Sequence, residues 1–479
     1  MTDSIVKQSV HRTFRHRGLR TAMARLGLAA SLMAVSHTGL SAAPASQTEG
    51  QPAPTALNTS AVVEGLKNWW NGKKVTGDWF GLREPVADNG ITLGGTWRGL
   101  YFGIADSANG SGNAFTQELL FSGRVDFLKL TKAQTLDGLA GFIEGRWREP
   151  GYNANPNNIV GGSPLFNPSR FSGGLGWRLV TFGLTYTTPE LFGVEDLVTV
   201  TGGWLRPQRE FINQPLSGLF ANNAMAVAKG LGGNIPFSAS FSSWGGTLLV
   251  EPADWQYTKL GLFMSYPEAT QSSNNGLMFQ GYTPDPSQNG FFFMGESGFT
   301  PKIGPDKLAG RYAFGTYFYE EDNPQFGTSK YGFYWQADQM LYREPSGGEK
   351  LSDQGLSLFS LATFAPNGYN NNYPFYFQSG LVYEGLIPSR DRDQLMFGIA
   401  FGQYSDRVQD AARNNKNKKT KKSQPLPVPE NTTFLEAGYR IKVSGWSYVQ
   451  PFVQYIVQPN GTTAVANATI LGLFIGTEF

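Results

Sequence analysis

The sequence predicts an all-β protein, a 16-stranded antiparallel transmembrane β-barrel with short periplasmic turns, long extracellular loops and a short N-terminal helical segment. Three observations predict it. Of 479 residues, 16% are charged, 14% are aromatic and 59 are glycine, which favours strands joined by turns over helices. Stretches that alternate apolar and polar residues recur from about residue 91 onward. The connections between these stretches are long and short in turn, which is typical of outer-membrane barrels.

The first residues have the pattern of a secretory leader. Basic residues from Lys7 to Arg25 precede an apolar stretch, Leu26–Val35, that is too short to span a bilayer. We expect residues 1–42 to be a signal peptide, with cleavage at residue 45 as a second possibility and an uncleaved anchor as the alternative. Six of the 39 Lys/Arg and one of the 37 Asp/Glu lie in this segment, so the mature chain would carry a net charge near −3. The chain is therefore not expected to bind nucleic acid.

Several kinds of chemistry are excluded by composition. Cysteine is absent, and the three histidines, His11, His16 and His37, all lie in the expected leader. Most zinc sites, thiol catalysis and Ser-His-Asp hydrolysis are thereby excluded from the mature chain. We expect no metal, no cofactor and no enzyme activity, with a glycosidase that uses paired carboxylates as the enzyme alternative. No later window offers about 18 uninterrupted apolar residues, so no transmembrane helix is expected.

Residues 43–90 differ from the rest and are expected to form an N-terminal arm with short helices. Its first part is polar and rich in small residues, and AVVEGLKNWWNG (61–72) predicts a short helix. GDWFGLREPVADNGITL (77–93) predicts a helical turn that ends at Asn89-Gly90 and leads into the first strand. The barrel is expected over residues 91–479.

Sixteen segments of mostly 10 to 13 residues have the length of a tilted strand that crosses a bilayer. In ELLFSGRVDF (118–127), Leu119 and Phe121 share one face, whereas Glu118 and Arg124 share the other. If the apolar faces meet lipid, the charged faces line an aqueous lumen. The segments are about 91–103, 116–129, 139–149, 176–188, 196–206, 243–251, 257–266, 291–299, 309–319, 330–343, 355–365, 374–386, 392–404, 432–443, 446–458 and 467–479.

The loops carry a second, independent signal. If the first strand runs outward, the loops after odd-numbered strands face outside, and these are mostly long, up to 36 residues for 207–242. The loops after even-numbered strands are mostly short, which is the barrel pattern. The last strand, LGLFIGTEF (471–479), alternates up to Phe479. We expect Phe479 to close the barrel against the first strand, because an open sheet edge is not tolerated in lipid; a chance terminal Phe is the alternative.

In its opening and closing segments, the sequence resembles the carbohydrate-selective porin family (OprB type) of Gram-negative outer membranes. Residues 77–93 are similar to the family's opening "GDWGGLR … GI" segment. EAGYRIKVSGWSYVQPFVQYIVQPNG (436–461) is similar to its "E..YR..V..W..lQP..QYi..P" signature, and LGLFIGTEF to its closing strand. The chain departs from the pattern at Phe80, which replaces a usual Gly, at Pro85, and in the Lys-rich run 414–422. The resemblance implies a sixteen-stranded barrel, a bacterial outer-membrane location and passive diffusion of sugars.

A sugar presents hydroxyl groups that donate and accept, with apolar faces between them, so a sugar-selective constriction favours Arg, Asp and Glu beside aromatic rings. The densest set of charges expected to face the lumen comes from the first three strands. We expect these charges to line the narrowest point of the lumen; ordinary wall charges paired with one another are the alternative. Arg146 and Arg148 are the preferred residues for the narrowest point, because they precede a long loop. The candidates are Arg98, Glu118, Arg124, Asp126, Glu144, Arg146 and Arg148.

The loop 207–242 mixes small, apolar and polar residues, a composition that suits a loop folded into the lumen, where Arg209, Glu210 and Asn213 would contribute polar groups. A surface loop packed on its neighbours is the alternative. The run 414–422 is a solvated loop or a contact for lipopolysaccharide phosphates. We expect small sugars and outer-membrane lipid as partners, and a monomer or a homotrimer. A general or anion-type porin is the alternative function.

Overall fold

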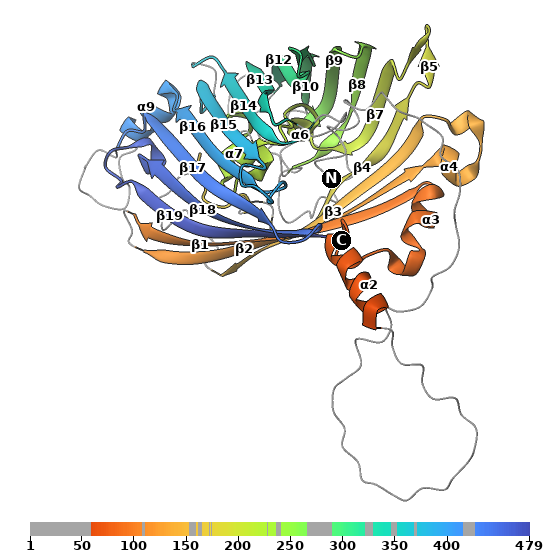
Figure 1. Cartoon of the computed structure of the whole chain (residues 1–479). Helices are drawn as coiled ribbons and strands as arrows, with labels where there is room; N and C mark the ends of the chain where they lie inside the picture. Colours follow the sequence, from red (N-terminus) through yellow and green to blue (C-terminus); the bar gives the residue numbers. More distant parts are fainter. Residues whose placement is uncertain are drawn as a thin grey trace, which may run out of the picture.

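The computed structural model contains a closed barrel of sixteen long antiparallel strands (Figure 1). Each strand pairs with the next along the chain, and β1 pairs with β19 to close the sheet. The predicted fold class is therefore confirmed, and every one of the sixteen expected segments corresponds to one of these strands. The structure describes residues 59–479 except 108–110, 153–159, 161–164, 172, 174, 228, 236–240, 266–289, 321–328, 346–351, 368–370 and 415–426. The expected signal peptide and residues 43–58 lie outside the described residues.

The barrel strands are β1 (Ile91–Asp106), β2 (Gly112–Asp126), β3 (Leu139–Tyr152), β4 (Gly176–Thr187), β7 (Val198–Leu205), β8 (Ser243–Ala253), β9 (Gln256–Ser265), β10 (Gly290–Phe299), β12 (Leu308–Tyr319), β13 (Lys330–Arg343), β14 (Gly355–Phe364), β15 (Phe375–Glu384), β16 (Gln394–Gln403), β17 (Asn431–Lys442), β18 (Ser447–Val457) and β19 (Ala468–Glu478). Short strands β5 (Glu190–Leu191) and β6 (Val194–Glu195) form a separate hairpin, and β11 (Lys302–Ile303) extends β12.

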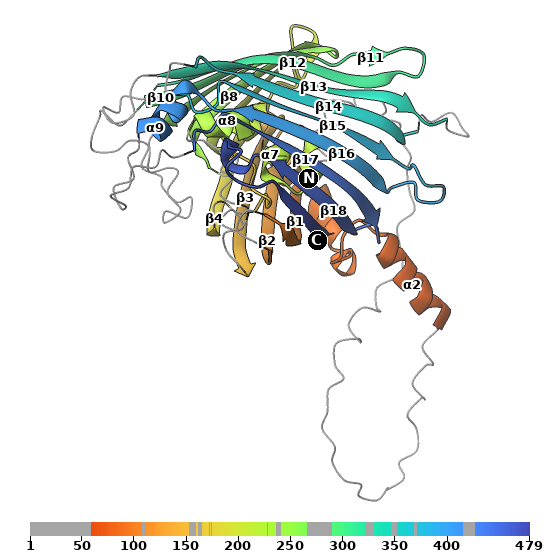
Figure 2. The same ribbon diagram turned by 90° about the vertical axis from the view of Figure 1, so that its left-hand side faces the viewer.

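Short helices occupy the ends and the interior of the barrel (Figures 1 and 2). Among the described residues, no helix is long and apolar enough to cross a membrane. The helices and single turns are α2 (Thr59–Asn71), η1 (Trp79–Gly81), α3 (Arg83–Asp88), α4 (Phe127–Thr131), η2 (Gln134–Leu136), α6 (Pro207–Phe211), η3 (Ser217–Leu219), α7 (Asn223–Val227), α8 (Lys229–Asn234), α9 (Asp406–Asn414) and η7 (Pro459–Gly461).

The outer surface of the barrel is a belt of exposed apolar side chains. Because paired residues of neighbouring strands point to the same face, the row Trp97, Leu119, Trp147 and Trp177 lies on one side of the wall. The Trp177 side chain is 57% exposed on that side. On the opposite side, buried residues such as Leu100 and Phe102 face the interior and pack under the inward loops. The expected apolar outer face is therefore confirmed along this part of the wall, whereas the inner face is apolar where the inward loops pack on it and not polar throughout.

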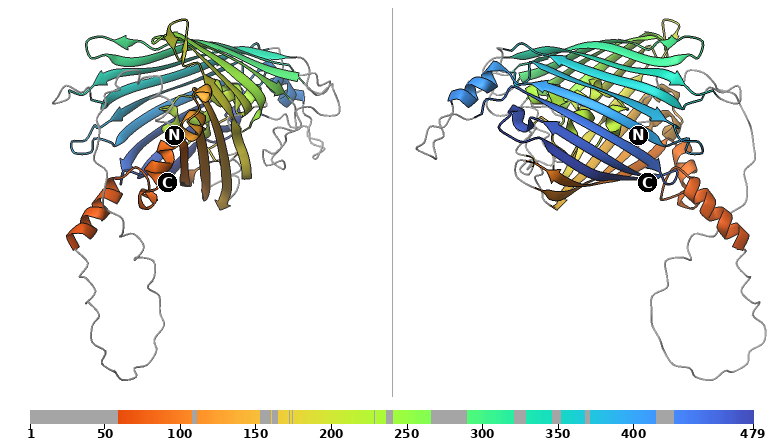
Figure 3. Two further views of the ribbon diagram at one scale, coloured as in Figure 1. Left: turned by 90° about the vertical axis from the view of Figure 1, so that its right-hand side faces the viewer. Right: turned by 60° about the vertical axis from the view of Figure 1, so that its left-hand side comes forward.

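The N-terminal arm attaches at the end of the barrel where the short turns lie; Figure 3 shows α2 at this end and α9 at the other. The backbone N–H of Val75 donates to the Glu478 carbonyl at 2.8 Å, and Lys74 lies 3.2 Å from the Glu478 carboxylate. Trp446, in the β17–β18 turn, donates its indole N–H to the Trp69 carbonyl at 3.2 Å. The arm therefore contacts both the last strand, through Glu478, and the β17–β18 turn, through Trp446.

The seam between the first and last strands is paired up to the final residue. Gly95 and Phe479 exchange two backbone hydrogen bonds of 3.0 Å. The Phe479 ring lies 6.3 Å from the ring of Phe121 on the next strand. A Cβ at Gly95 would come within 2.6 Å of the Phe479 ring, so glycine at this position makes room for it.

Candidate functional site

A row of opposite charges crosses the inner wall of β1, β2 and β3. Arg98, Glu118 and Arg148 are directly opposite one another in the strand register. Glu118 is buried and forms an ion pair with Arg98 through one oxygen and with Arg148 through the other, the latter at 2.6 Å. Charge-assisted bonds to both oxygens hold the two guanidinium groups in fixed positions.

The next pair links the wall to the loop that follows β7. Arg206 lies 2.7 Å from the Glu144 carboxylate of β3. Arg146 and Arg178 face each other in the β3–β4 register beside this pair, and both are buried. Arg209, in α6, lies close enough to Arg206 and Glu144 for their charges to affect its pKa.

Arg209 stays charged despite its surroundings. Burial, together with the nearby Arg206 and Arg98, lowers the pKa of Arg209 to about 10. Burial, together with Arg98, likewise lowers the pKa of Arg170 to about 9. Both values lie above neutral pH, so both side chains carry positive charge under ordinary conditions.

Two loops fold into the barrel from the end opposite α2. We call residues 206–235 the constriction loop and residues 165–171 the short inward loop. The constriction loop runs along the wall from β9 to β18: Lys259 of β9 donates to the Glu210 carbonyl at 2.6 Å, and Gln214 donates to the Ser360 carbonyl of β14 at 2.8 Å. The alternative of a surface loop is therefore wrong, because these contacts lie inside the barrel.

The short inward loop packs on the constriction loop. Arg170 donates from its backbone N–H to the Ala221 carbonyl at 3.0 Å and from its guanidinium to the Phe220 carbonyl at 3.0 Å. The neighbouring Phe171 ring lies 5.6 to 5.8 Å from the guanidinium carbons of Arg98, Arg148 and Arg170. An aromatic face therefore lies directly beside the charged row.

A second polar cluster lies on the opposite wall. Arg311 and Asp338 form an ion pair at 2.9 Å between β12 and β13. Glu296 of β10 accepts hydrogen bonds from the hydroxyls of Tyr257 and Tyr334 at 2.7 and 2.9 Å. Among the residues that the structure describes, polar groups therefore line two facing sides of the lumen.

The structure brings together most of the sequence-predicted residues but not all of them. Arg124 lies on the same inner face of β2 as Glu118 but is exposed, six residues further toward the short-turn end. Asp126 accepts the Lys129 N–H at 3.0 Å and caps helix α4. The clustered candidates are Arg98, Glu118, Glu144, Arg146, Arg148 and Arg209.

Other members of the cluster were missed from the sequence. Arg170 lies in a loop without periodicity, and Arg440 lies on β17, distant in sequence, so no local pattern joins them to the first three strands. Arg206 is the last residue of the expected strand 196–206 but was not recognised as a candidate. For Arg178, the alternation along β4 was an available signal, because this residue lies opposite Arg146.

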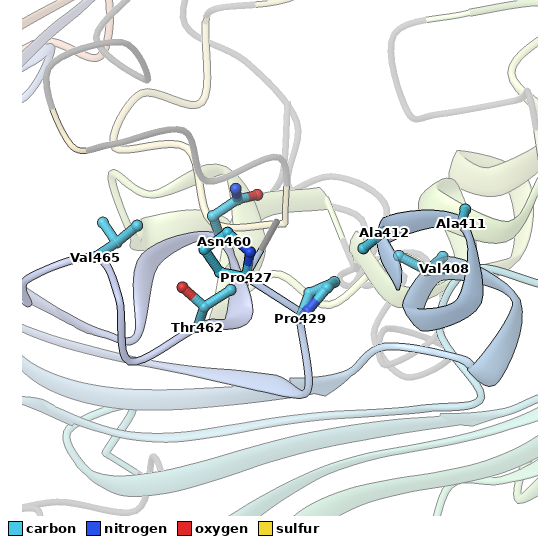
Figure 4. A pocket seen from close by; sticks show the side chains of 8 residues that line it. All are labelled: Val408, Ala411, Ala412, Pro427, Pro429, Asn460, Thr462 and Val465. Atoms are coloured by element: carbon cyan, nitrogen blue, oxygen red, sulfur yellow. The ribbon is translucent and has the colours of Figure 1, made fainter. Parts of the chain in front are cut away.

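A cavity of about 330 Å³ lies apart from these charges, near the loop end of the barrel (Figure 4). Its lining side chains include no charged residue, so it offers little to hold a polar solute. It is lined by Val408, Ala411, Ala412, Pro427, Pro429, Asn460, Thr462 and Val465. The Lys-rich run 414–422 lies, apart from its first residue, outside the described residues.

Comparison with known proteins agrees with the resemblance seen in the sequence. Porin B of Pseudomonas aeruginosa is 30% identical over 250 residues, covering 47% of this chain and 52% of that protein. A putative porin, QuiX, of Acinetobacter baylyi is 23% identical over 264 residues, covering 52% and 58%. The chain thus matches little more than half the length of these relatives.

Solved structures support the same fold. The high-pH structure of Pseudomonas putida OprB superposes with a TM-score of 0.72 at 23% identity, covering 85% of this chain and 99% of that one. A closed barrel with an apolar outer belt is the architecture of bacterial outer-membrane proteins. The model of the carbohydrate-selective porin, OprB family, matches residues 149–479. The chain therefore belongs to the carbohydrate-selective porin family.

Proposed function

We propose that this chain is an outer-membrane porin through which small, glucose-like sugars diffuse passively across an Arg/Glu/Asp-lined constriction. The observation that carries the proposal is the row of Arg98, Glu118 and Arg148 beside the Phe171 ring, at the level where the inward loops fill part of the lumen. Guanidinium groups offer donors in fixed directions to sugar hydroxyls. The Phe171 ring is fully buried, so it packs beside the arginines and supports their positions rather than meeting the sugar itself.

No bond is made or broken in this mechanism; the protein selects by size and by hydrogen bonding. The carboxylates hold the arginines in place, so a sugar meets donors that need little rearrangement. Within the cluster, the side chains of Arg98, Arg206 and Glu144 are 25%, 16% and 11% exposed, so they are accessible to water. Arg146 is 1% exposed and acts through its charge. We therefore propose Arg98 as the main sugar-contacting residue.

A second candidate function, passage of small anions, is favoured by the excess of positive charge. Among the described residues, the interior cluster contains more arginines than glutamates, and such a field raises the local concentration of anions. The arginines are Arg98, Arg146, Arg148, Arg170, Arg178, Arg206, Arg209 and Arg440, and the glutamates are Glu118, Glu144 and Glu436.

The test is sugar transport by the purified protein in liposomes and planar bilayers. Glucose should enter liposomes faster than a charged solute of similar size, and should reduce single-channel ion current in a concentration-dependent way. Arg98→Ala should weaken this block about tenfold, the effect of losing a charge-assisted hydrogen bond. Arg124→Ala is the matched control, because Arg124 lies outside the cluster, and it should leave the block unchanged.

Equal entry of both solutes and no block by glucose would reject the sugar preference and leave the anion pathway. Absence of any channel activity in correctly folded protein would reject both functions. Equal effects of Arg98→Ala and Arg124→Ala would place the sugar contact elsewhere.

A further inference from the structure

The family signature at residues 436–461 forms one polar array on the inner wall of β17 and β18. Glu436 and Gln454 are directly opposite one another in the strand register. Arg440 donates through Nε to the Gln450 amide oxygen at 2.8 Å. All four side chains are almost fully buried, with exposures between 0 and 7%. A solute in the lumen therefore does not touch them in this structure.

The array instead forms hydrogen bonds with the backbone of the constriction loop. Glu436 accepts the backbone N–H groups of Ala221 and Asn222 at 2.8 and 3.1 Å, one with each carboxylate oxygen. Gln454 donates to the same carboxylate at 3.1 Å, and its own amide oxygen accepts from the Asn222 side chain at 3.3 Å. A carboxylate that receives two backbone donors fixes the segment that carries them.

The other half of the array holds the preceding turn. Arg440 and Gln450 both donate to the Leu219 carbonyl, at 3.0 and 3.1 Å. Gln454 also reaches the Pro168 carbonyl of the short inward loop at 3.3 Å. All four side chains therefore belong to an array that binds the constriction loop, and Gln454 also binds the short inward loop, near the point where Arg170 joins the two.

Close packing supports this contact. On the neighbouring strand β16, a Cβ at Gly398 would come within 2.7 Å of the Phe220 ring and 2.6 Å of the Met225 methyl. The loop thus lies directly against the wall beside the array. Its flanks have separate attachments, Gln214 to β13 and β14 and Asn234 to the Tyr373 carbonyl. Loss of the array would therefore remove the polar attachment of residues 219–222 to the wall, leaving them held through Arg170 of the short inward loop, and would not detach the whole loop.

We propose that Glu436, Arg440, Gln450 and Gln454 are positioning residues that clamp residues 219–222 of the constriction loop and so set the open width of the pore. The signature in this chain then encodes pore size rather than direct contact with solute. This inference does not require a preference for sugars, since it concerns only the width available to any solute.

The experiment compares the wild-type chain with Glu436→Gln in planar bilayers and liposomes. The substitution keeps the side-chain shape but replaces one acceptor oxygen by an NH₂ group that faces a backbone N–H. The released segment should widen the pore, raise single-channel conductance and admit oligosaccharides that the wild-type protein excludes. Glu384→Gln is the matched control, because Glu384 accepts from Gln394 at the short-turn end of β15, opposite the end from which the two loops enter.

Loop release is measured separately, since the sequence contains no cysteine. Ala224→Cys, at a fully buried site in α7, should react slowly with a charged thiol reagent. Combined with Glu436→Gln, the labelling rate should rise at least about tenfold, the factor that corresponds to ~1.4 kcal/mol. Gln454→Leu, which removes a neutral member of the clamp, should show a smaller rise and serves if Glu436→Gln gives no heat-modifiable barrel.

Heat-modifiable gel mobility establishes that each variant forms a barrel. Folded Glu436→Gln and Gln454→Leu proteins with wild-type conductance, size limit and labelling rate would overturn the proposal. Equal changes in the Glu384→Gln control would also overturn it, because the effect would then follow from loss of any wall carboxylate.

Discussion

At the scale of single residues, one departure from the family pattern lies at a strained backbone position. Phe80 occupies a position where the family usually has glycine, and its φ is 58°, in the left-handed region. This conformation costs a residue with a Cβ about 1–2 kcal/mol but costs glycine almost nothing. The Phe80 side chain is 65% exposed, so little packing compensates for the strain.

We therefore expect Phe80→Gly to stabilise the arm locally by ~1 kcal/mol, after the flexibility that glycine adds to the unfolded chain is subtracted. Amide hydrogen exchange over residues 78–88 should slow about fivefold. Phe192→Gly is the control, because Phe192 also has a positive φ, 55°, and is exposed, but lies in the β5–β6 hairpin. Faster exchange in Phe80→Gly would show that the ring holds the arm in place.

The buried Glu118 gives a second prediction at this scale. Glu118→Gln leaves Arg98 and Arg148 facing each other without the carboxylate between them, and breaking a buried ion pair costs about 3–5 kcal/mol. The free energy of unfolding, measured with denaturant in detergent, should fall by that order. Glu190→Gln, at an exposed position, should change it by less than ~0.5 kcal/mol. Similar losses in both variants would contradict a special role for the charged row.

At the scale of elements, the strands were predictable and the inward loops were not. Each strand has one face toward lipid and one toward the interior, so its alternation can be read from the strand's own residues, as in 118–127. The position of Arg170 depends instead on carbonyls of residues 218–221, about fifty positions away in sequence. No local pattern contains that information. Five of the eleven charged residues in the cluster were therefore found from strand periodicity and Arg209 from the composition of its loop, whereas the position of Arg170 required the fold.

The last strand carries a prediction of its own. Phe479→Ala keeps the two backbone bonds to Gly95 but removes the ring that packs toward Phe121. Deleting a large buried or interfacial ring costs about 3–5 kcal/mol in well-packed sites. The barrel should unfold at a lower temperature on unboiled gels, and less of it should assemble. Phe192→Ala, which removes a ring that is 90% exposed, is the control; equal behaviour of the two variants would contradict a role in closure.

At the scale of the whole molecule, the arginine-rich interior lies within a chain of nearly balanced charge. The local field, rather than net charge, should then set ion selectivity. In a potassium chloride gradient, the reversal potential should show chloride more permeant than potassium. The preference should weaken at high salt, because the Debye length falls from about 10 Å at 0.1 M to about 3 Å at 1 M. A cation preference at low salt would show that the wall carboxylates dominate.

The attachment of the arm beside the seam has a practical consequence. Ile91 enters the barrel and Phe479 leaves it at the same rim, next to the Lys74–Glu478 ion pair. A covalent linker that replaces the arm and joins Phe479 to Ile91 would cross no wall, although it would remove the contacts of Lys74 and Val75 with Glu478. New ends opened at another rim turn, such as residues 254–255, would then yield a circularly permuted channel with every strand in its original neighbourhood.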